Sequence, residues 1–298
     1  MKPEHAREII ECLPRGRTLF PYGKDLYAFQ LLQKAVGESR SIQNLKQSPF
    51  GRLLEKPAVR NIVGRLGKPT LSASDLAWYE PSNPEVYRLS LATYDGHDQK
   101  SRKGVNLVLQ LNLNERDARF VEKHIPERAN DPFEYYCHPV SQGRHRTLAW
   151  SRIDLDLDRG EALIEEIQND RIRDTQWAVN RLMRNKGAKS IRWGGVTLTR
   201  EFLIHYWEDI LAASRVMWDE AMLAATLRLL IDEIGIQTIY YHTPESGICY
   251  KGNDCKTAPT SLYTQLPRKF CFSRTNELPS FLKKRRRPAP FMRLKMGA

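Results

Sequence analysis

The chain has 298 residues, of which 41% are hydrophobic and 28% charged, a balance typical of a globular protein with a substantial core. Five cysteines in a chain of this length do not form a disulfide scaffold, and no apolar run is long enough to cross a bilayer. The first residues, Met1–Leu13, are too polar for a signal peptide, so we expect a cytoplasmic protein with no membrane partner.

The formal net charge of +12 is concentrated at the C-terminal end. Lys283–Ala298 holds seven basic residues and no acidic one; without these seven, 40 of the 47 basic residues remain against 35 acidic ones. We interpret residues 281–298 as a disordered basic tail that suits phosphate contacts, with a simple solubilising end as the alternative. The basic run of this tail is Lys283, Lys284, Arg285, Arg286 and Arg287.

Residues 1–80 are predicted to be a mostly helical N-terminal region. Apolar residues have helical spacing over Ala6–Cys12, Lys24–Val36 and Ala58–Leu66, and proline or glycine separates these stretches. A helix-turn-helix is conceivable here, but a packing subdomain is favoured because only length and basic residues support the former.

From Glu85 onward the apolar period changes to two, which predicts a meander of antiparallel strands. The tight turn Asp158-Arg159-Gly160 joins the last two of them. The predicted strands are Val86–Tyr94, Val105–Leu113, Thr147–Leu157 and Glu161–Gln168, with a helix at Asn114–Glu127 between the second and third.

A strand–helix–strand unit follows the meander and organises the rest of the chain. A helical insert (about 171–213) leads into an apolar helix, Arg215–Ile234, which Ser214 can cap and which Gly235 can end. Apolar residues surround most of this helix, so we expect other elements to cover more than one of its faces. The next strand is Ile236–His242.

A short helix near Ser261–Leu266 and a last strand, Lys269–Arg274, complete the predicted elements. Antiparallel strands followed by strand–helix–strand predict an α+β fold for residues 81–280, with a mixed, mostly antiparallel sheet and a central long helix.

Two adjacent carboxylates are the first candidates for chemistry. Glu165 and Glu166 are neighbours on one strand, so their side chains are expected on opposite faces of the sheet. One of them would then face a covered side or a cleft, where burial would raise its pKa and suit it to act as a general base. The alternative is an ion pair of Glu165 with a strand neighbour such as Arg152. Asp170, where the strand ends, is equally an N-cap or a functional acid.

His242 ends the second strand of the central unit, at the edge where such sheets bind ligands; a structural histidine is the alternative. His242 could also join Cys249, Cys255 and Cys271 around zinc. These cysteines lack the close spacing that brings two thiolates to one ion, so we expect no metal.

The helix after Asp170 carries the strongest binding signal. Arg173, Trp177, Arg181 and Arg184 recur at spacings of four, four and three, which places them on one side of the helix. Arginines beside an exposed indole suit phosphates and a stacked base. The alternative is a solvated arginine face with Trp177 packed against a neighbour.

The order of the elements resembles that of the GNAT acyltransferase fold: meander, long helix, strand, short helix, strand. Ser261–Leu266 followed by Phe270-Cys271-Phe272 looks like the "LY-x-x-x-GF" element of that family. The tyrosine of this element often serves as general acid, so the resemblance assigns that role to Tyr263.

A second resemblance is more local. Leu163–Asp170 resembles an "EIQSDW" stretch found in domains of phage and mobile-element polyproteins. Those domains continue with a helical insert, an apolar helix that opens near a tryptophan (here Trp218), and a "G-x-x-x-I-x-Y/W-x-T" strand (here Gly235–Thr243). The two resemblances together cover roughly residues 144–274.

These resemblances imply acyl transfer, but one departure concerns the cofactor. GNAT enzymes hold the pyrophosphate of coenzyme A on a glycine-rich turn that opens the central helix. This chain has Ser214–Asp219 at that point, with no glycine and with Trp218 crowding the turn. Acetyl-CoA is therefore a doubtful cofactor, and the sequence identifies no other.

GNAT-like enzymes that take acyl groups from charged tRNA need no coenzyme A turn. We therefore expect a protein that acts on or with nucleic acid, RNA or tRNA above all, by acyl or aminoacyl transfer, with Glu165 or Glu166 as base and Tyr263 as acid. The alternative is a non-catalytic module of a phage or mobile-element system. Such a module would bind nucleic acid or a protein partner through the arginine–tryptophan helix and the basic tail.

Overall fold

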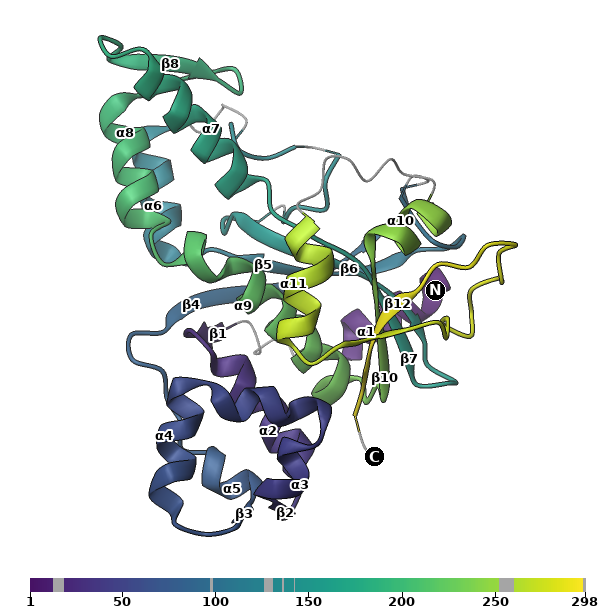
Figure 1. Cartoon of the computed structure of the whole chain (residues 1–298). Coiled ribbons are helices and arrows are strands. Elements are labelled where there is room, and N and C mark those ends of the chain that lie inside the picture. The colour runs from purple at the N-terminus through teal and green to yellow at the C-terminus, as the bar shows by residue number, and fades with distance from the viewer. Residues whose placement is uncertain are drawn as a thin grey trace.

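The computed structural model describes residues 1–12, 19–96, 99–125, 131–135, 137–141, 143–251 and 260–296. In these residues, eight strands form one sheet in the order β1-β4-β5-β6-β7-β10-β12-β11 (Figure 1). Its strands are β1 (Leu19–Tyr22), β4 (Glu85–Tyr94), β5 (Asn106–Asn112), β6 (Thr147–Asp156), β7 (Glu161–Gln168), β10 (Thr238–His242), β12 (Phe291–Lys295) and β11 (Ser273–Thr275).

The sheet is mixed. Strands β4 to β7 form the expected antiparallel meander, and β7 pairs in parallel with β10 through Thr238–Tyr241 opposite Glu161–Ile164. All other pairs in the sheet are antiparallel. This confirms the predicted α+β class with a mostly antiparallel sheet, and it confirms that the two strands of the central unit lie side by side.

The central helix covers one face of this sheet. Helix α9 (Ser214–Arg228) continues into a π-helical turn, η3 (Leu229–Glu233), and contacts β5, β6 and β7. Helices α2 (Leu26–Val36) and α11 (Thr260–Lys269) pack against α9 on the same side (Figure 1). Gly235 follows with a φ of +83°, as expected for a residue that ends a helix. Ser214, in contrast, makes no capping bond; its buried hydroxyl accepts from the phenol of Tyr87 at 3.3 Å.

The N-terminal region is tied to the sheet at its first strand and at one buried carboxylate. Glu220 of α9 accepts hydrogen bonds from the phenol of Tyr22 and the backbone N–H of Asp25, both at 2.7 Å, and pairs with Lys269 of α11. The remaining elements of this region are α1 (Pro3–Cys12), β2 (Arg40–Ser41), α3 (Ile42–Lys46), η1 (Pro49–Glu55), α4 (Pro57–Leu66), β3 (Thr70–Leu71) and α5 (Ala73–Leu76).

A helical arm extends from the other end of the sheet (Figure 1). A row of stacked rings, Phe120, Phe202 and Tyr206, holds its helices together, with ring centroids 5.4–5.8 Å apart. The arm consists of α6 (Glu115–His124), α7 (Arg171–Arg184), β8 (Ser190–Trp193), β9 (Val196–Thr199), α8 (Arg200–His205) and η2 (Tyr206–Ile210).

The C-terminal part corrects two predictions. Lys269 ends α11, and the strand expected over Lys269–Arg274 is the short β11 instead. Residues 291–295 form β12, the last strand but one of the sheet, between β10 and β11, with Phe291 and Leu294 buried. The expected disordered tail is therefore wrong for residues 281–296: apolar residues after the basic run form a strand that pairs with β10. Helix α10 (Pro244–Lys251) follows β10 directly.

Candidate functional site

A β-bulge places Glu165 and Glu166 on the same face of the sheet, which corrects the expectation of opposite faces. Ile164 pairs with Ile153, yet Arg152 pairs with Glu166, so Glu165 is an extra residue in β7. The core side chains of β7 show the same shift, because Ala162, Ile164 and Ile167 all face the α9 side. Both carboxylates therefore turn toward the opposite face.

Glu165 belongs to a continuous hydrogen-bonded network with His242. Its Oε2 lies 3.2 Å from Nε2 of His242, and the hydroxyl of Ser101 lies 2.9 Å from both atoms. The backbone N–H of Ser101 donates to Oε1 at 3.1 Å. On the other side of the imidazole, the hydroxyl of Ser246 lies 2.8 Å from Nδ1. The structure thus brings two predicted site residues together with two serines that the sequence did not indicate.

Ser246, His242 and Glu165 are linked in the order of the Ser-His-acid triad of hydrolases. All three side chains, however, are completely buried. The Ser246 hydroxyl also accepts from the backbone N–H of Thr243 at 2.9 Å, while Thr243 Oγ1 accepts from that of Ser246 at 3.1 Å. This reciprocal pair is a capping box at the start of α10. Ser246 thus anchors a helix, and no substrate reaches its hydroxyl in this structure.

The protonation states are those of an ionised carboxylate beside a neutral imidazole. Burial alone would raise the pKa of Glu165, but the His242 hydrogen bond and the Lys251 charge outweigh it and lower that pKa to about 2. Burial lowers the pKa of His242, against the pull of Glu165. Glu165 therefore lacks the raised pKa expected of a general base.

Glu166 is also held in an ion pair. Arg152 donates to its two oxygens at 2.8 and 2.6 Å, and both side chains are almost fully buried. Burial opposes ionisation, yet the charge of Arg152 keeps the pKa of Glu166 below its usual range. Arg152, which the sequence suggested as an ion-pair partner of Glu165, is thus the partner of Glu166.

The two parallel strands stop pairing at the site. Ile164 and Tyr241 form their last pair, and beyond it the carbonyl oxygen of Glu165 accepts from the ammonium of Lys251, at the end of α10. That ammonium also lies 3.6 Å from Glu165 Oε2. A side chain of the protein itself thus occupies the place where β7 and β10 separate.

Tyr263 lies apart from these groups. Its ring meets that of Tyr241 edge-on at 6.0 Å, within the core cluster on the α9 side. His242 is the next residue of the same strand and faces the other way, against Phe291. The predicted acid and the predicted bases are therefore on opposite faces and do not form one site.

Helix α7 presents Trp177 to solvent, with 52% of the residue exposed. The guanidinium of Arg173 lies 5.2 Å from the indole centre and is held by Asp170 at 2.7 Å and Asp174 at 3.1 Å. Arg173 thus positions the indole and is already neutralised, whereas the sequence suggested that it contacts phosphate. The side chain of Asp170 makes no capping bond; Asn169 accepts from the N–H of Ile172 instead.

The cations farther along this arm are not paired with acidic side chains of the described residues. Residues 175–200 contain no Asp or Glu, and none of the following five makes an ion pair within the described part of the chain. These exposed cations are Arg181, Arg184, Lys186, Lys189 and Arg192.

A histidine that the sequence did not single out lies at the base of α7. Nδ1 of His138 makes a short contact with Asp170, and its ring packs against Trp150 at 5.1 Å. No local pattern marked this residue, because it belongs to no helix or strand and meets Asp170 only through the fold.

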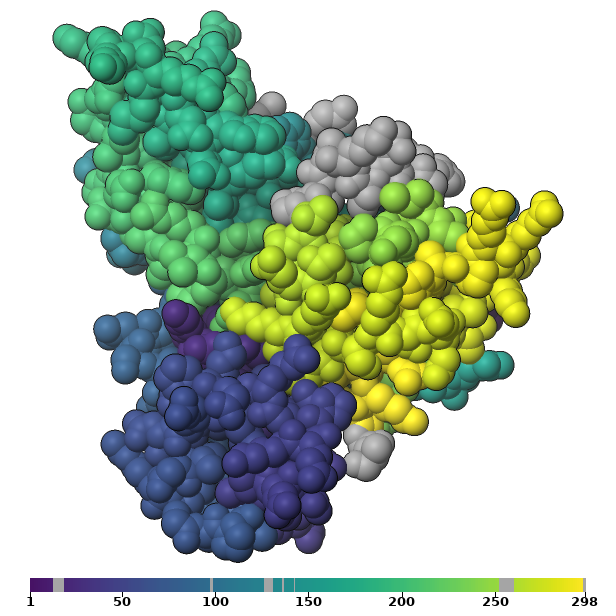
Figure 2. All heavy atoms as spheres, viewed as in Figure 1, coloured from purple at the N-terminus to yellow at the C-terminus, as the bar shows by residue number. Residues whose placement is uncertain are grey.

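The basic run 283–287 forms an exposed loop fixed at both ends. Leu282 and Phe291 are buried in a small cluster with Tyr250, and the guanidinium of Arg285 lies 5.8 Å from the Tyr250 ring. Phe291 pairs with His242, so this loop returns to the sheet at the edge where β7 and β10 end. Figure 2 shows the α7 arm and this loop at two ends of one face of the molecule.

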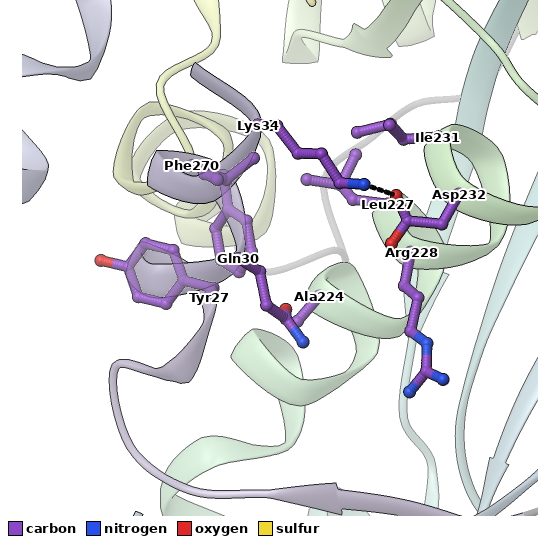
Figure 3. A pocket seen from close by; sticks show the side chains of 10 residues that line it. Tyr27, Gln30, Lys34, Ala224, Leu227, Arg228, Ile231, Asp232 and Phe270 are labelled. Carbon is purple, nitrogen blue, oxygen red and sulfur yellow. Dashed lines mark ion pairs between the residues drawn. The ribbon is translucent and has the colours of Figure 1, made fainter. Parts of the chain in front are cut away.

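A surface pocket lies elsewhere, between α2 and the end of α9 (Figure 3). Lys34 and Asp232 form an ion pair of 2.6 Å across it, beside Gln30, Leu227 and Ile231. None of the predicted site residues lines this pocket. Among the described residues, no group of three or more His, Cys, Asp or Glu side chains could hold a metal ion; Cys255 lies outside them.

Comparison with known proteins gives no match: no protein-family model fits the sequence, and no curated protein or solved structure matches it significantly. Within the described ranges, no helix has both the length and the apolar character needed to cross a bilayer.

Proposed function

We propose that this protein binds nucleic acid, with single-stranded RNA as the favoured ligand, through the exposed side of α7. The observation that carries the proposal is the half-exposed indole of Trp177, fixed on the guanidinium of Arg173, which is itself held by two buried aspartates. A rigid exposed indole is a surface on which any base can stack.

The charges beside the indole support the same ligand. Arg181 and Arg184 follow Trp177 by one and two turns of the same helix and have no acidic partner in the described structure. Cations that lack a protein counter-charge are free to exchange small ions for phosphates, which makes binding depend steeply on salt. A stacking ring followed by unpaired cations fits a strand with unstacked bases better than a closed duplex.

The loop 283–287 is the second contact in this proposal. Its five cations are exposed and without ion pairs among the described residues, and its buried ends keep them at the sheet edge from which α7 also starts. A ligand long enough to touch both places would gain affinity from the second contact.

A titration with fluorescent RNA tests the proposal. We expect Trp177→Ala to weaken binding by 1–3 kcal/mol, roughly the value of one stacked base. The double variant R181E/R184E should weaken binding further and flatten the salt dependence, by about 0.7 in the log–log slope for each lost phosphate contact. The matched control is R60E/R65E on α4, which changes the net charge equally at two exposed arginines.

Unchanged binding in W177A and R181E/R184E would overturn the proposal for this surface. An equal loss in R60E/R65E would show that only net charge matters. Parallel titrations with DNA of the same sequence would show whether the ligand is RNA.

Acyl or aminoacyl transfer is the second candidate. The observation that favours it is the separation of the parallel strands β7 and β10 beyond Ile164 and Tyr241, with the long helix α9 between them in the chain. Ligands of open α/β sheets bind where neighbouring strands separate in this way. Calorimetry with acetyl-CoA and incubation with charged tRNA test this candidate. If acetyl-CoA gives no binding heat and no acyl group is transferred from tRNA, the candidate is ruled out.

A further inference from the structure

We propose that His138 is a catalytic residue that cleaves the RNA bound on α7, taking a proton from a ribose 2′-hydroxyl. This activity goes beyond the proposed binding and rests on it. The substrate class is single-stranded RNA whose base stacks on Trp177.

The first support is the fixed orientation of the His138 ring. Asp170 is an acceptor, so the contact with Nδ1 assigns the proton to that nitrogen and leaves the lone pair of Nε2 outward. Asp170 is itself buried and held, with its other oxygen accepting from Arg173 at 2.7 Å and from Gln168 at 3.2 Å. A histidine oriented by a fixed carboxylate is the arrangement of a general base.

The segment that carries His138 is also held in place. Its backbone N–H donates to the carbonyl of Tyr135 at 2.9 Å, and the amide of Gln110 donates to the carbonyl of Pro139 at 2.9 Å. The ring of Trp150 packs against the imidazole in a tilted orientation. The base thus belongs to a rigid surface, as efficient proton transfer requires.

The second support is access. The side chain of His138 is 29% exposed, and Nε2 has no hydrogen-bond partner among the described residues. Arg173 links the dyad to the indole, because the same guanidinium that binds Asp170 lies against Trp177. Tyr135, 41% exposed, packs edge-on against the imidazole at 5.4 Å. A strand stacked on Trp177 would therefore share one surface with the free nitrogen, joined to it through Arg173 and Asp170.

The third support is the choice of nucleophile. The ionisable groups nearest the imidazole are Asp170 at Nδ1, Arg173 and Asp174, which are paired with one another, and the phenol of Tyr135, whose ring packs against it. No serine, cysteine or lysine of the described residues is hydrogen-bonded to the imidazole, so we assign the attacking oxygen to the ligand itself. RNA carries one beside each phosphate, and DNA does not.

The reaction balances without an added reactant. Nε2 takes the proton of the 2′-hydroxyl, the 2′-oxygen forms a bond to the adjacent phosphorus, and the bond from phosphorus to the 5′-oxygen breaks. The 5′-oxygen receives the proton that His138 holds. The products are a 2′,3′-cyclic phosphate and a 5′-hydroxyl, and His138 returns to its neutral state.

The experiment uses the full chain and a pool of random RNAs of about 20 nucleotides, long enough to cover a single-strand site. Chelator is present, cleavage is followed on denaturing gels, and the new ends are identified by mass spectrometry. Binding is measured on a 2′-O-methyl version of the same pool, which cannot react. We expect His138→Ala to lower the cleavage rate about 100-fold or more, with binding changed less than twofold.

Two further variants separate catalysis from structure. His124→Ala removes an exposed imidazole that bonds only a backbone carbonyl, and it should cleave like the wild type. Asp170→Asn keeps the size of the orienting group, and it should lower the rate and alter its pH profile.

Binding without cleavage would overturn this inference and leave the proposed RNA binding intact. Cleavage that persists in His138→Ala would also overturn the inference. Absence of binding to the 2′-O-methyl pool would overturn the proposed function itself, and the inference with it.

Discussion

Glu165 and His242 face each other where β7 and β10 separate, with Oε2 and Nε2 3.2 Å apart and neither side chain exposed. The pair is one link of a chain that runs from Ser246 through the imidazole to Ser101. Because this series of hydrogen bonds joins α10, β10, β7 and the segment before β5, it fixes these four parts relative to one another at the end of the sheet where β7 and β10 stop pairing. Its first role is therefore structural, and that role is measurable.

The stability of the protein should fall in two steps as the pH is lowered. The pKa of His242 is lowered on folding, so the unfolded chain takes up the proton first and stability is lost below about pH 6.5. The pKa of Glu165 is lowered from 4.5 to about 2, so its contribution is lost from about pH 4.5 downward. Urea unfolding at a series of pH values measures both steps.

In the same experiment, His242→Gln should lack the first step, and Glu165→Gln should cost about 3 kcal/mol at neutral pH because it removes a fully buried carboxylate charge that pairs with Lys251. The exposed His205 supplies the control, since H205Q should keep both steps. A first step unchanged in H242Q would show that another group causes it.

Removal of residues 283–298 should abolish cooperative unfolding. This truncation deletes β12, whose loss would expose β10 and detach β11. Replacing the five cations of the 283–287 loop by glutamine should leave the melting temperature nearly unchanged, because their side chains are exposed. Thermal unfolding of the two variants makes the comparison. A truncated protein that melts like the wild type would show that β12 adds nothing to the sheet.

The centre of the fold was predictable because its signals are local and redundant. Alternating leucines mark β5, a tight turn joins β6 to β7, and Gly235 follows an apolar helix of the expected length. β12 was not predicted, because the five cations before it have the composition of a disordered terminus. No pattern in Glu165-Glu166 indicates a bulge, because the extra residue is set by pairing with β6 and not by the two residues themselves.

The candidate site was predictable only where its residues lie at regular spacing on one helix. The spacing of Trp177, Arg181 and Arg184 follows from a helix, so their shared exposed side could be anticipated. His138, Ser101 and Lys251 meet their partners across 32 to 86 residues of sequence and belong to loops or helix ends. Contacts of this kind depend on the tertiary fold, which periodicity does not report.

Gly194 should be irreplaceable where the next glycine is not. Both residues have positive φ, +53° and +85°, in the turn between β8 and β9. A Cβ at Gly194 would come within 2.5 Å of Cα of Pro132, whereas a Cβ at Gly195 would meet nothing within 4 Å. We expect Gly195→Ala to cost about 1 kcal/mol from backbone strain alone, and Gly194→Ala to cost clearly more.

The change would also reach the proposed RNA surface, because Pro132 precedes Tyr135 and His138 in the chain. Chemical unfolding gives the two stabilities, and exchange of the Tyr135 amide reports the displaced segment. Equal stabilities of the two variants would show that Pro132 moves aside without cost.

Arg171 and Arg173 should differ greatly in their contribution to stability, although both lie in the first turn of α7 and pair with acidic residues. Arg171 is completely buried and bonds Asp131 at 3.0 Å and Glu134 at 2.7 Å, while Arg173 is 38% exposed. Replacing Arg171 by methionine would remove the cation of Glu134 and leave Asp131 with Arg146 alone, which costs about 3–5 kcal/mol. Arg173→Met should cost less, because water screens the partly exposed guanidinium and Asp170 keeps its hydrogen bond from Gln168.

The pH dependence of the deficit identifies its cause. Burial already raises the pKa of Glu134 against the opposing charge of Arg171, so loss of that charge would raise it further. A group whose folded-state pKa is raised contributes stability that is lost as the pH rises through that pKa. The deficit of Arg171→Met should therefore be smaller at pH 5 than at pH 8, as measured by urea unfolding at both. A deficit independent of pH would assign the loss to packing of the Arg171 side chain and not to its charge.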